Sequence, residues 1–290
     1  GGYDMKFGIC YCYWSKDWEG NDYPKMIERA RACGFDALEI FWGRTLTMEQ
    51  QEVNEILAAS KANDVEIYVS GGFGKESQAD ETGRRAAVEK SKRLIEAIAR
   101  LGSHNFSGIN YGAWCKFDRP IDKEKSFEQS AKSLKEIGRC AADYNVSWNM
   151  EVVNRFENYM LNTAAEARKL ADMVNHPNIN ILLDIFHGMI EEDDLAEAIR
   201  TAGSRLGHYH MGSNNRRPPK PGFLPWQQVV DALKEIKYDR CISFEPLVRT
   251  GGSVALEGGN VWRNMLPADA GDKYLDDLIK ESLGYIKGMF

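Results

Sequence analysis

Four strand-like runs in the second half of the chain each end in a residue that can bind a metal ion. The four residues are Glu151, Asp184, His210 and Glu245. Three carboxylates and one imidazole form the kind of site that hard or borderline divalent cations such as Mn²⁺, Mg²⁺ or Co²⁺ prefer, whereas structural zinc sites are rich in thiolates. A single acidic residue at a strand end is usually a solvated rim group, but four such residues at equivalent points of a repeating pattern predict one shared site.

Two further histidines lie close to these residues in the sequence. His208 shares one face of a strand with His210, because side chains alternate along a strand with a period of two. Only the residue nearer the carboxyl end should reach the mouth of a barrel, so we assign His210 to the metal and expect His208 to be an interior histidine with a hydrogen bond. His187 follows Asp184 by three residues, in the predicted loop after that strand, and from there it could reach a substrate.

The elements that must position these residues are short β-prone runs that alternate with longer segments of helical period. The predicted strands cover 5–11, 37–40, 66–69, 105–109, 147–153, 179–183, 206–209 and 241–244. The predicted helices cover 23–33, 48–63, 81–101, 127–144, 163–174, 193–202, 225–236 and 273–285. Eight such units most economically form a single α/β domain over residues 5–290, a (β/α)8 TIM barrel, with a doubly wound sheet as the alternative.

Composition limits the possible partners. Hydrophobic residues make up 43% of the 290 residues, the formal net charge is -6, and no apolar run approaches a membrane span. We therefore expect a small-molecule partner, with neither nucleic acid nor a membrane. The six cysteines show no CxxC spacing and no signal-peptide pattern is present, so we expect reduced thiols and a cytoplasmic protein. Residues 1–4 are expected to be a remnant of expression without a function.

Aromatic residues occur in the long loops that follow several predicted strands. Trp18 and Trp114 are the two that we expect to contact a substrate, while Trp14, Phe117 and Trp262 lie in comparable loops. Aromatic side chains at the mouth of a barrel can form the wall that a sugar needs. They can equally anchor the loops on the barrel rim, and the sequence leaves both interpretations open.

A family resemblance rests on motifs that follow the fifth to eighth strands. The motifs are Glu151-Val152-Val153-Asn154-Arg155-Phe156-Glu157-Asn158, Asn162-Thr163-Ala164, Leu183-Asp184-Ile185-Phe186-His187, Ile190-Glu191-Glu192-Asp193, Ile199-Arg200-Thr201-Ala202-Gly203, Glu245-Pro246 and Thr250-Gly251-Gly252. Together they resemble the ketose 3-epimerases, the D-tagatose and D-psicose (D-allulose) 3-epimerase family of the xylose-isomerase-like barrels. The resemblance covers nearly the whole chain and is densest from Glu151 to Trp262.

The resemblance implies one divalent metal ion per subunit, Mn²⁺ or otherwise Co²⁺ or Mg²⁺, bound by the four residues named first. It implies that Glu157, His187 and Arg216 hold the O1/O2 end of an unphosphorylated ketose. In that family one metal-bound glutamate removes the C3 proton, and the other returns a proton to the opposite face of a cis-enediolate. Those roles fall to Glu151 and Glu245. The family usually forms homodimers or homotetramers.

Elementary chemistry agrees with this implication. A proton beside a carbonyl is too weakly acidic for a bare carboxylate, so the charge that develops on the oxygen must be stabilised, as a divalent Lewis acid does. Inversion needs a base on each face, and Glu151 and Glu245 lie on strands separated around the ring. The chain departs from the family pattern at Cys10, at 110–115 and at Ser213. We expect these positions to surround the substrate and to affect the choice of sugar.

Three alternatives remain open from the sequence. Another enzyme of the same barrel class could use these metal ligands for aldose–ketose isomerisation, hydroxypyruvate isomerisation or dehydration of a keto-inositol. A barrel endonuclease would need several metals, more than the five histidines present and a basic surface. A sugar-binding barrel without catalysis would need many of the same pocket groups, although an intact pair of glutamates argues against it.

Overall fold

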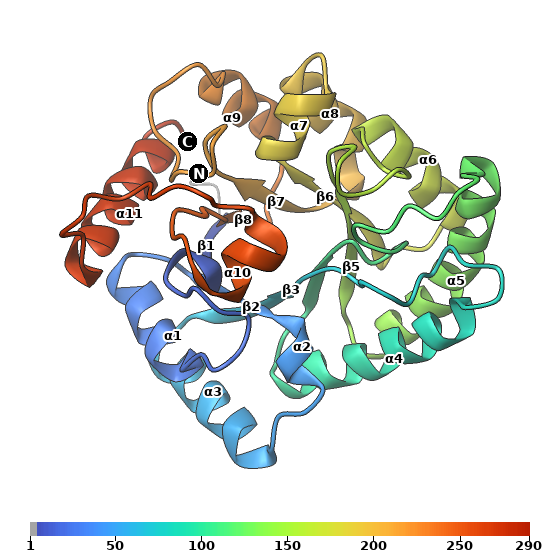
Figure 1. The fold of residues 1–290 in the computed structure, drawn as a ribbon, viewed down its shortest axis with the longest axis horizontal. Coiled ribbons are helices and arrows are strands. Elements are labelled where there is room, and N and C mark those ends of the chain that lie inside the picture. Colours follow the sequence, from blue (N-terminus) through green and yellow to red (C-terminus); the bar gives the residue numbers. More distant parts are fainter. Residues whose placement is uncertain (1–4) are drawn as a thin grey trace.

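The computed structural model describes residues 5–290 and shows a closed barrel of eight parallel strands surrounded by helices (Figure 1). Residues 1–4, predicted to be a remnant of expression, lie outside the described residues. The strands are β1 (Lys6–Cys10), β2 (Ala37–Phe41), β3 (Glu66–Ser70), β4 (Asn105–Gly108), β5 (Ser147–Val152), β6 (Ile179–Asp184), β7 (Leu206–Met211) and β8 (Cys241–Phe244). Because β8 pairs with β1, the sheet has no free edge, and the predicted (β/α)8 barrel is confirmed.

One long helix follows each strand and covers the outside of the barrel. These helices are α1 (Tyr23–Ala32), α3 (Gln50–Asn63), α4 (Arg84–Arg100), α5 (Lys123–Asp143), α6 (Ala164–Val174), α8 (Leu195–Ala202), α9 (Trp226–Glu235) and α11 (Asp272–Lys287). In α5 the apolar residues Phe127, Leu134, Ile137 and Ala141 recur at helical spacing and are buried. Residues 5–290 contain no helix that is both long enough and apolar enough to cross a membrane.

Shorter helical segments lie in the connections between strands and outer helices. They are η1 (Tyr11–Tyr13), α2 (Trp42–Thr45), α7 (Ile185–Glu191), η2 (Gly203–Arg205), α10 (Gly252–Val254) and η3 (Ala255–Gly259). The segment α7 corrects the expectation that His187 lies in a loop. The Asp184 side chain accepts a hydrogen bond from the Phe186 backbone N–H at 2.8 Å, so the last residue of β6 also caps a helix.

Register explains why the four predicted metal ligands meet. Asp184 of β6 pairs with His210 of β7. Glu151 of β5 pairs with Leu182, which precedes Asp184 by two residues on β6. Glu245 follows β8 directly, and its backbone N–H donates to Met211 O at 3.0 Å. All four side chains therefore reach the carboxyl-terminal mouth of the barrel, where barrel enzymes place their active sites.

One close backbone approach shapes this mouth. Gly108 ends β4 with φ +150°, and a Cβ atom built there would lie 1.9 Å from the carbonyl oxygen of Gly71. The neighbouring Gly71 N–H donates to Ser107 O at 3.1 Å, so the connection after β3 lies directly against β4. Only glycine at position 108 allows this contact, because any side chain would push the two segments apart.

Candidate metal and substrate site

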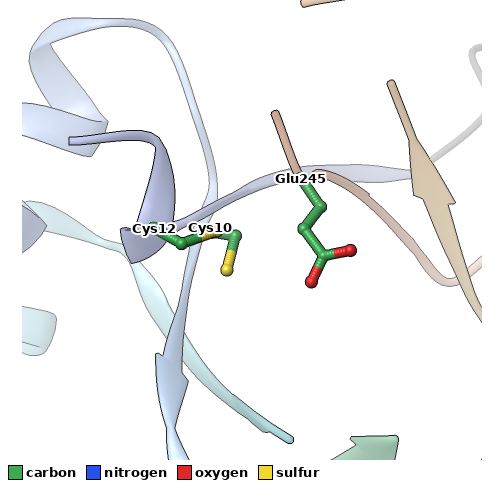
Figure 2. Close-up of side chains that lie close together, drawn as sticks. All are labelled: Cys10, Cys12 and Glu245. Atoms are coloured by element: carbon green, nitrogen blue, oxygen red, sulfur yellow. The ribbon is translucent and has the colours of Figure 1, made fainter. Parts of the chain in front are cut away.

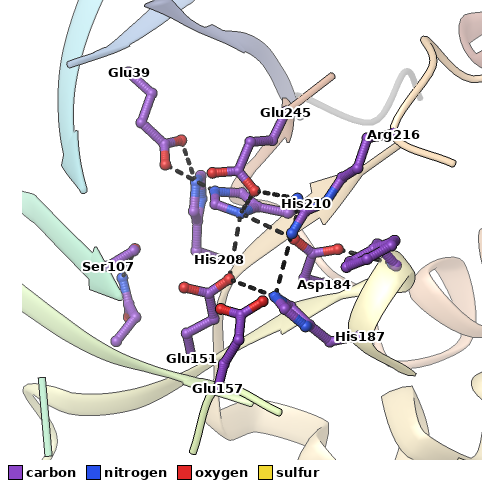
Figure 3. A network of polar contacts seen from close by, with 12 residues as sticks. Glu39, Ser107, Glu151, Glu157, Asp184, His187, His208, His210, Arg216 and Glu245 are labelled. Carbon is purple, nitrogen blue, oxygen red and sulfur yellow. Dashed lines mark hydrogen bonds and ion pairs between the residues drawn. The ribbon is translucent and has the colours of Figure 1, made fainter. Parts of the chain in front are cut away.

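Glu151, Asp184, His210 and Glu245 converge at the mouth of the barrel (Figure 3). Each offers a ligand atom, and these four atoms all lie within 4.8 Å of one another. The Nδ1 atom of His210 is 3.3 Å from Glu245, 3.6 Å from Asp184 and 3.9 Å from Glu151. The structure thus brings together all four residues that the strand-end pattern singled out.

Glu39 of β2, which no sequence pattern predicted, contacts both histidines of β7 across the barrel interior. Its two carboxylate oxygens accept hydrogen bonds from Nε2 of His210 at 2.7 Å and from Nε2 of His208 at 2.8 Å. The expected hydrogen bond of His208 is therefore present, and Glu39 is its partner. Glu39 is fully buried, and although burial would raise its pKa, the two histidines hold the pKa well below its usual value.

The contact with Glu39 determines which nitrogen of His210 faces the site. Since Nε2 donates to Glu39, the other nitrogen, Nδ1, is free to bind a cation. This Nδ1 is a buried atom without a hydrogen-bond partner among the described residues. A free nitrogen lone pair that faces three carboxylates is the arrangement that a divalent cation would satisfy, so the side chains present fit the predicted metal ion.

The charges of the site also fit a divalent cation. Burial and the Glu245 carboxylate raise the pKa of Glu151 well above 4.5. Burial would lower the pKa of His210, but the charges of Glu39 and Glu245 outweigh it and raise that pKa well above 6.5. A divalent ion held by these residues would compete with protons for the same atoms, as metal ions generally do for acidic and imidazole ligands.

Arg216 lies beside these carboxylates and supplies a positive charge. Its Nη1 atom is 2.7 Å from Glu245 and 3.4 Å from Asp184, and the guanidinium lies 4.0 Å from the ring centroid of Phe186. Arg216 has φ +63°, a left-handed conformation that is uncommon outside glycine. Burial would raise the pKa of Asp184, but Arg216 and the nearby histidines hold it well below its usual value, so Asp184 remains ionised.

His187 and Glu157 lie on the same side of the site and are linked through Asn154. The backbone N–H of Asn154 donates to His187 Nδ1 at 3.1 Å, a shorter contact than the 3.4 Å between His187 Nε2 and Nη2 of Arg216, so we assign the proton of a neutral imidazole to Nε2. That Nε2 is 3.7 Å from Glu151, and burial lowers the pKa of His187, which favours the neutral ring. Glu157 accepts a hydrogen bond from the indole N–H of Trp114 at 2.8 Å. These groups can act as a donor and an acceptor for substrate hydroxyls.

A cavity of about 1040 Å³ opens above the carboxylates. Eight of the predicted site residues line it, namely Trp18, Trp114, Glu151, Glu157, His187, His210, Arg216 and Glu245. Asp184, the remaining predicted metal ligand, is buried and does not line the cavity. Among the remaining loop aromatics, Trp262 also lines it, whereas Trp14 is buried and donates to Asp276, which makes Trp14 a loop anchor.

The positions that depart from the family pattern divide into two groups. Cys10, Trp114 and Cys115 line the cavity, as expected for residues that surround a substrate. Residues 110–113 do not line it, contrary to the expectation for that run, and neither does Ser213. Its hydroxyl donates to Pro218 O at 3.1 Å and stabilises the turn that carries Arg216, so its expected position beside the substrate is wrong.

Comparison with known proteins places this barrel in a family. The family model of the xylose isomerase-like TIM barrel matches residues 27–266, so the chain belongs to that family. D-psicose 3-epimerase of Ruminiclostridium cellulolyticum is 37% identical, over 97% of this chain and 96% of that protein. D-psicose 3-epimerase of Enterocloster bolteae is 34% identical, over 99% and 96%.

A solved structure gives the same result. The crystal structure of D-psicose 3-epimerase with D-tagatose from Clostridium cellulolyticum has a TM-score of 0.92 and 35% identity, and the match covers 98% of this chain and 99% of that one. Within the xylose isomerase-like barrels the chain is therefore a member of the ketose 3-epimerase family, an enzyme of the isomerase class. The resemblance stated from the motifs is confirmed.

Proposed function

We propose that this enzyme interconverts unphosphorylated ketoses that differ in configuration at C3, in a reaction that depends on a divalent metal ion. The observation that carries the proposal is the placement of Glu151 and Glu245. Glu151 lies on β5 and Glu245 directly follows β8, yet both belong to one group of possible metal ligands and line one cavity. Relatives that match nearly the whole chain are named D-psicose 3-epimerases, which supports the same reaction. The substrate pair D-fructose and D-psicose is the first candidate, and D-tagatose and D-sorbose form the second.

The two glutamates balance the proton transfers. One of them, ionised, takes the proton from C3, and the other, protonated, gives a proton to the opposite face of the resulting enediolate. Each glutamate ends in the state in which the other began, so the reverse reaction uses them with exchanged roles.

The metal ion would be held by Glu151, Asp184, His210 and Glu245. When bound, it would act as a Lewis acid that stabilises the negative charge on O2, the oxygen of the carbonyl carbon next to C3. Mn²⁺ is our first candidate, with Co²⁺ or Mg²⁺ as alternatives, because three oxygens and one nitrogen suit all three ions.

The remaining residues orient the sugar. We assign the O1/O2 end to Glu157, His187 and Arg216, which supply an acceptor, a neutral donor and a positive charge within one wall of the cavity. Trp18 and Trp114 supply apolar faces against which the ring or chain of a sugar can pack. A homodimer or homotetramer and a cytoplasmic location remain predictions.

The test is a chromatographic assay of the EDTA-stripped enzyme on D-fructose, D-psicose, D-tagatose and L-ribulose, with and without added Mn²⁺ or Co²⁺. We expect C3 epimers only when metal is present. Glu245→Gln should lower the rate by about 10²–10⁴-fold, because it removes a general acid–base group. Glu257→Gln is the matched control, since Glu257 is an exposed carboxylate on the rim of the same cavity. Turnover in metal-free enzyme, or products altered at another carbon, would contradict the proposal.

A further inference from the structure

A second group of possible ligands lies in the same cavity, on the side of β1. The thiols of Cys10 and Cys12 and the carboxylate of Glu245 each offer an atom, and these atoms all lie within 4.8 Å of one another (Figure 2). Strand β1 ends at Cys10 and turns at once into η1, which places Cys12 on the same wall. The pairing of β1 with β8 brings Cys10 close to Glu245. Ile9 pairs with Phe244, and the next residues along the two segments are Cys10 and Glu245.

We propose that Cys10, Cys12 and Glu245 form a second binding site, for a thiophilic divalent cation such as Zn²⁺ or Cd²⁺, which shares Glu245 with the proposed Mn²⁺ site. Thiolates and carboxylates are both ligands of such ions, and three protein ligands leave a fourth position of a tetrahedral site open toward the cavity. Tetrahedral zinc with zinc–sulfur bonds of about 2.3 Å holds two sulfurs about 3.8 Å apart, so modest side-chain rotations suffice.

The two thiols are free to accept an ion. Both cysteines are reduced, and Cys12 makes only a weak contact, at 4.0 Å, with the carbonyl oxygen of Pro246. Both side chains line the cavity, so an ion that enters by the substrate route reaches them without any opening of the barrel.

Glu245 connects the two sites. Its Oε2 atom contacts Arg216 and His210, so it already takes part in the group that would hold the first metal ion. A cation held by the two thiolates would draw this carboxylate toward β1. This inference rests on the proposed function, in which Glu245 is one of the two groups that exchange the C3 proton. Movement of Glu245 toward β1 would remove it from that exchange, so a thiophilic cation would inhibit the enzyme without competing for Asp184.

The direct test is a Cd²⁺ titration of the full-length enzyme that has first been saturated with Mn²⁺. Bound thiolates give an ultraviolet sulfur-to-cadmium charge-transfer band, whereas Cd²⁺ bound only by carboxylates and histidine gives none. We expect one Cd²⁺ per chain to produce the band, and Cys10→Ser or Cys12→Ser to abolish it. The control Cys140→Ser changes a half-buried thiol on α5, outside the cavity lining, and should keep the band.

A second measurement uses the unaltered protein and needs no variant to fold. Alkylation followed by mass spectrometry should show that one equivalent of Cd²⁺ protects Cys10 and Cys12 but leaves Cys115 reactive. Glu245→Gln should raise the Cd²⁺ concentration at half-saturation of the band. The proposal is overturned if no band and no protection appear, if the band survives both serine variants, or if Glu245→Gln leaves half-saturation unchanged. Because these readouts detect thiolates rather than turnover, they are independent of the proposed epimerase activity.

Discussion

The substitution Glu39→Gln tests whether Glu39 positions His210, the proposed metal ligand, without itself binding the metal ion. Glu39 accepts hydrogen bonds from Nε2 of both His210 and His208, at 2.7 Å and 2.8 Å. Glutamine keeps the size of the side chain but offers one acceptor oxygen and one amide NH₂. If the amide nitrogen faces His210, that ring must move its proton to Nδ1 and loses its free lone pair toward the metal. If the oxygen faces His210, His208 is left without an acceptor and the negative charge is still lost.

The expected size of the effect follows from this contact. Loss of a carboxylate that orients a histidine ligand typically weakens metal binding about 10–100-fold, or about 1.4–2.7 kcal/mol. Calorimetric titration of the metal-stripped protein with Mn²⁺ measures this directly. At saturating Mn²⁺ the turnover of Glu39→Gln should recover most of the wild-type value, because Glu39 contacts neither the cavity nor a substrate.

Glu66→Gln provides the matched control. Glu66 begins β3, on the strand next to β2, and its carboxylate is exposed and pairs with Lys6. The same change of charge there should leave Mn²⁺ affinity unchanged. The reasoning would be refuted if Glu39→Gln, with an unchanged circular dichroism spectrum, bound Mn²⁺ within twofold of wild type, or if Glu66→Gln weakened binding equally.

Three further predictions follow from the site and its support. Burial and the charge of Glu245 raise the pKa of Glu151, so a proton must leave when a cation binds, and competition titrations should show Mn²⁺ affinity falling as the pH is lowered. Gly108→Ala should cost about 3 kcal/mol or more in chemical denaturation, because its Cβ would meet a backbone oxygen. Trp114→Phe removes the indole hydrogen bond to Glu157, about 1 kcal/mol, and should raise KM roughly fivefold in steady-state kinetics.

Each of these predictions has a contrary outcome. A pH-independent Mn²⁺ affinity would mean that no proton occupies the site. Gly74→Ala, where a Cβ meets nothing within 4 Å, should be nearly neutral, and an equal loss there would contradict the argument from close approach. Trp262→Phe changes an exposed tryptophan of the same cavity, and a matching rise in KM would show that the hydrogen bond of Trp114 has no special role.

The barrel and its four metal-binding candidates could be predicted because both depend on regular patterns. Parallel strands all end at one mouth, so an acid or imidazole at the end of β5, β6, β7 and after β8 must share that mouth whatever the details of packing. The period of two placed His208 and His210 on one face of β7, and the hydrogen bond expected for His208 is present, while the metal role of His210 stays a prediction.

The parts that could not be predicted depend on contacts across the interior or on loop geometry. Glu39 lies in the apolar run of β2, and β2 is not a neighbour of β7, so strand pairing gives no hint of the contact with His210. An acid inside an apolar strand is the one signal, since such a group must find a partner. The left-handed conformation of Arg216 determines where its guanidinium lies, and no pattern in the sequence predicted that conformation.

The central claim is that a proton leaves C3 and another returns to the opposite face from a second carboxyl group. The most direct measurement is conversion of D-fructose by the Mn²⁺-loaded enzyme in D₂O, with the position of deuterium in the product read by NMR. The mechanism predicts D-psicose with deuterium at C3 and none at C1, and loss of this label transfer in Glu151→Gln and Glu245→Gln. Epimer without deuterium at C3, or label at C1, would contradict the two-carboxylate mechanism.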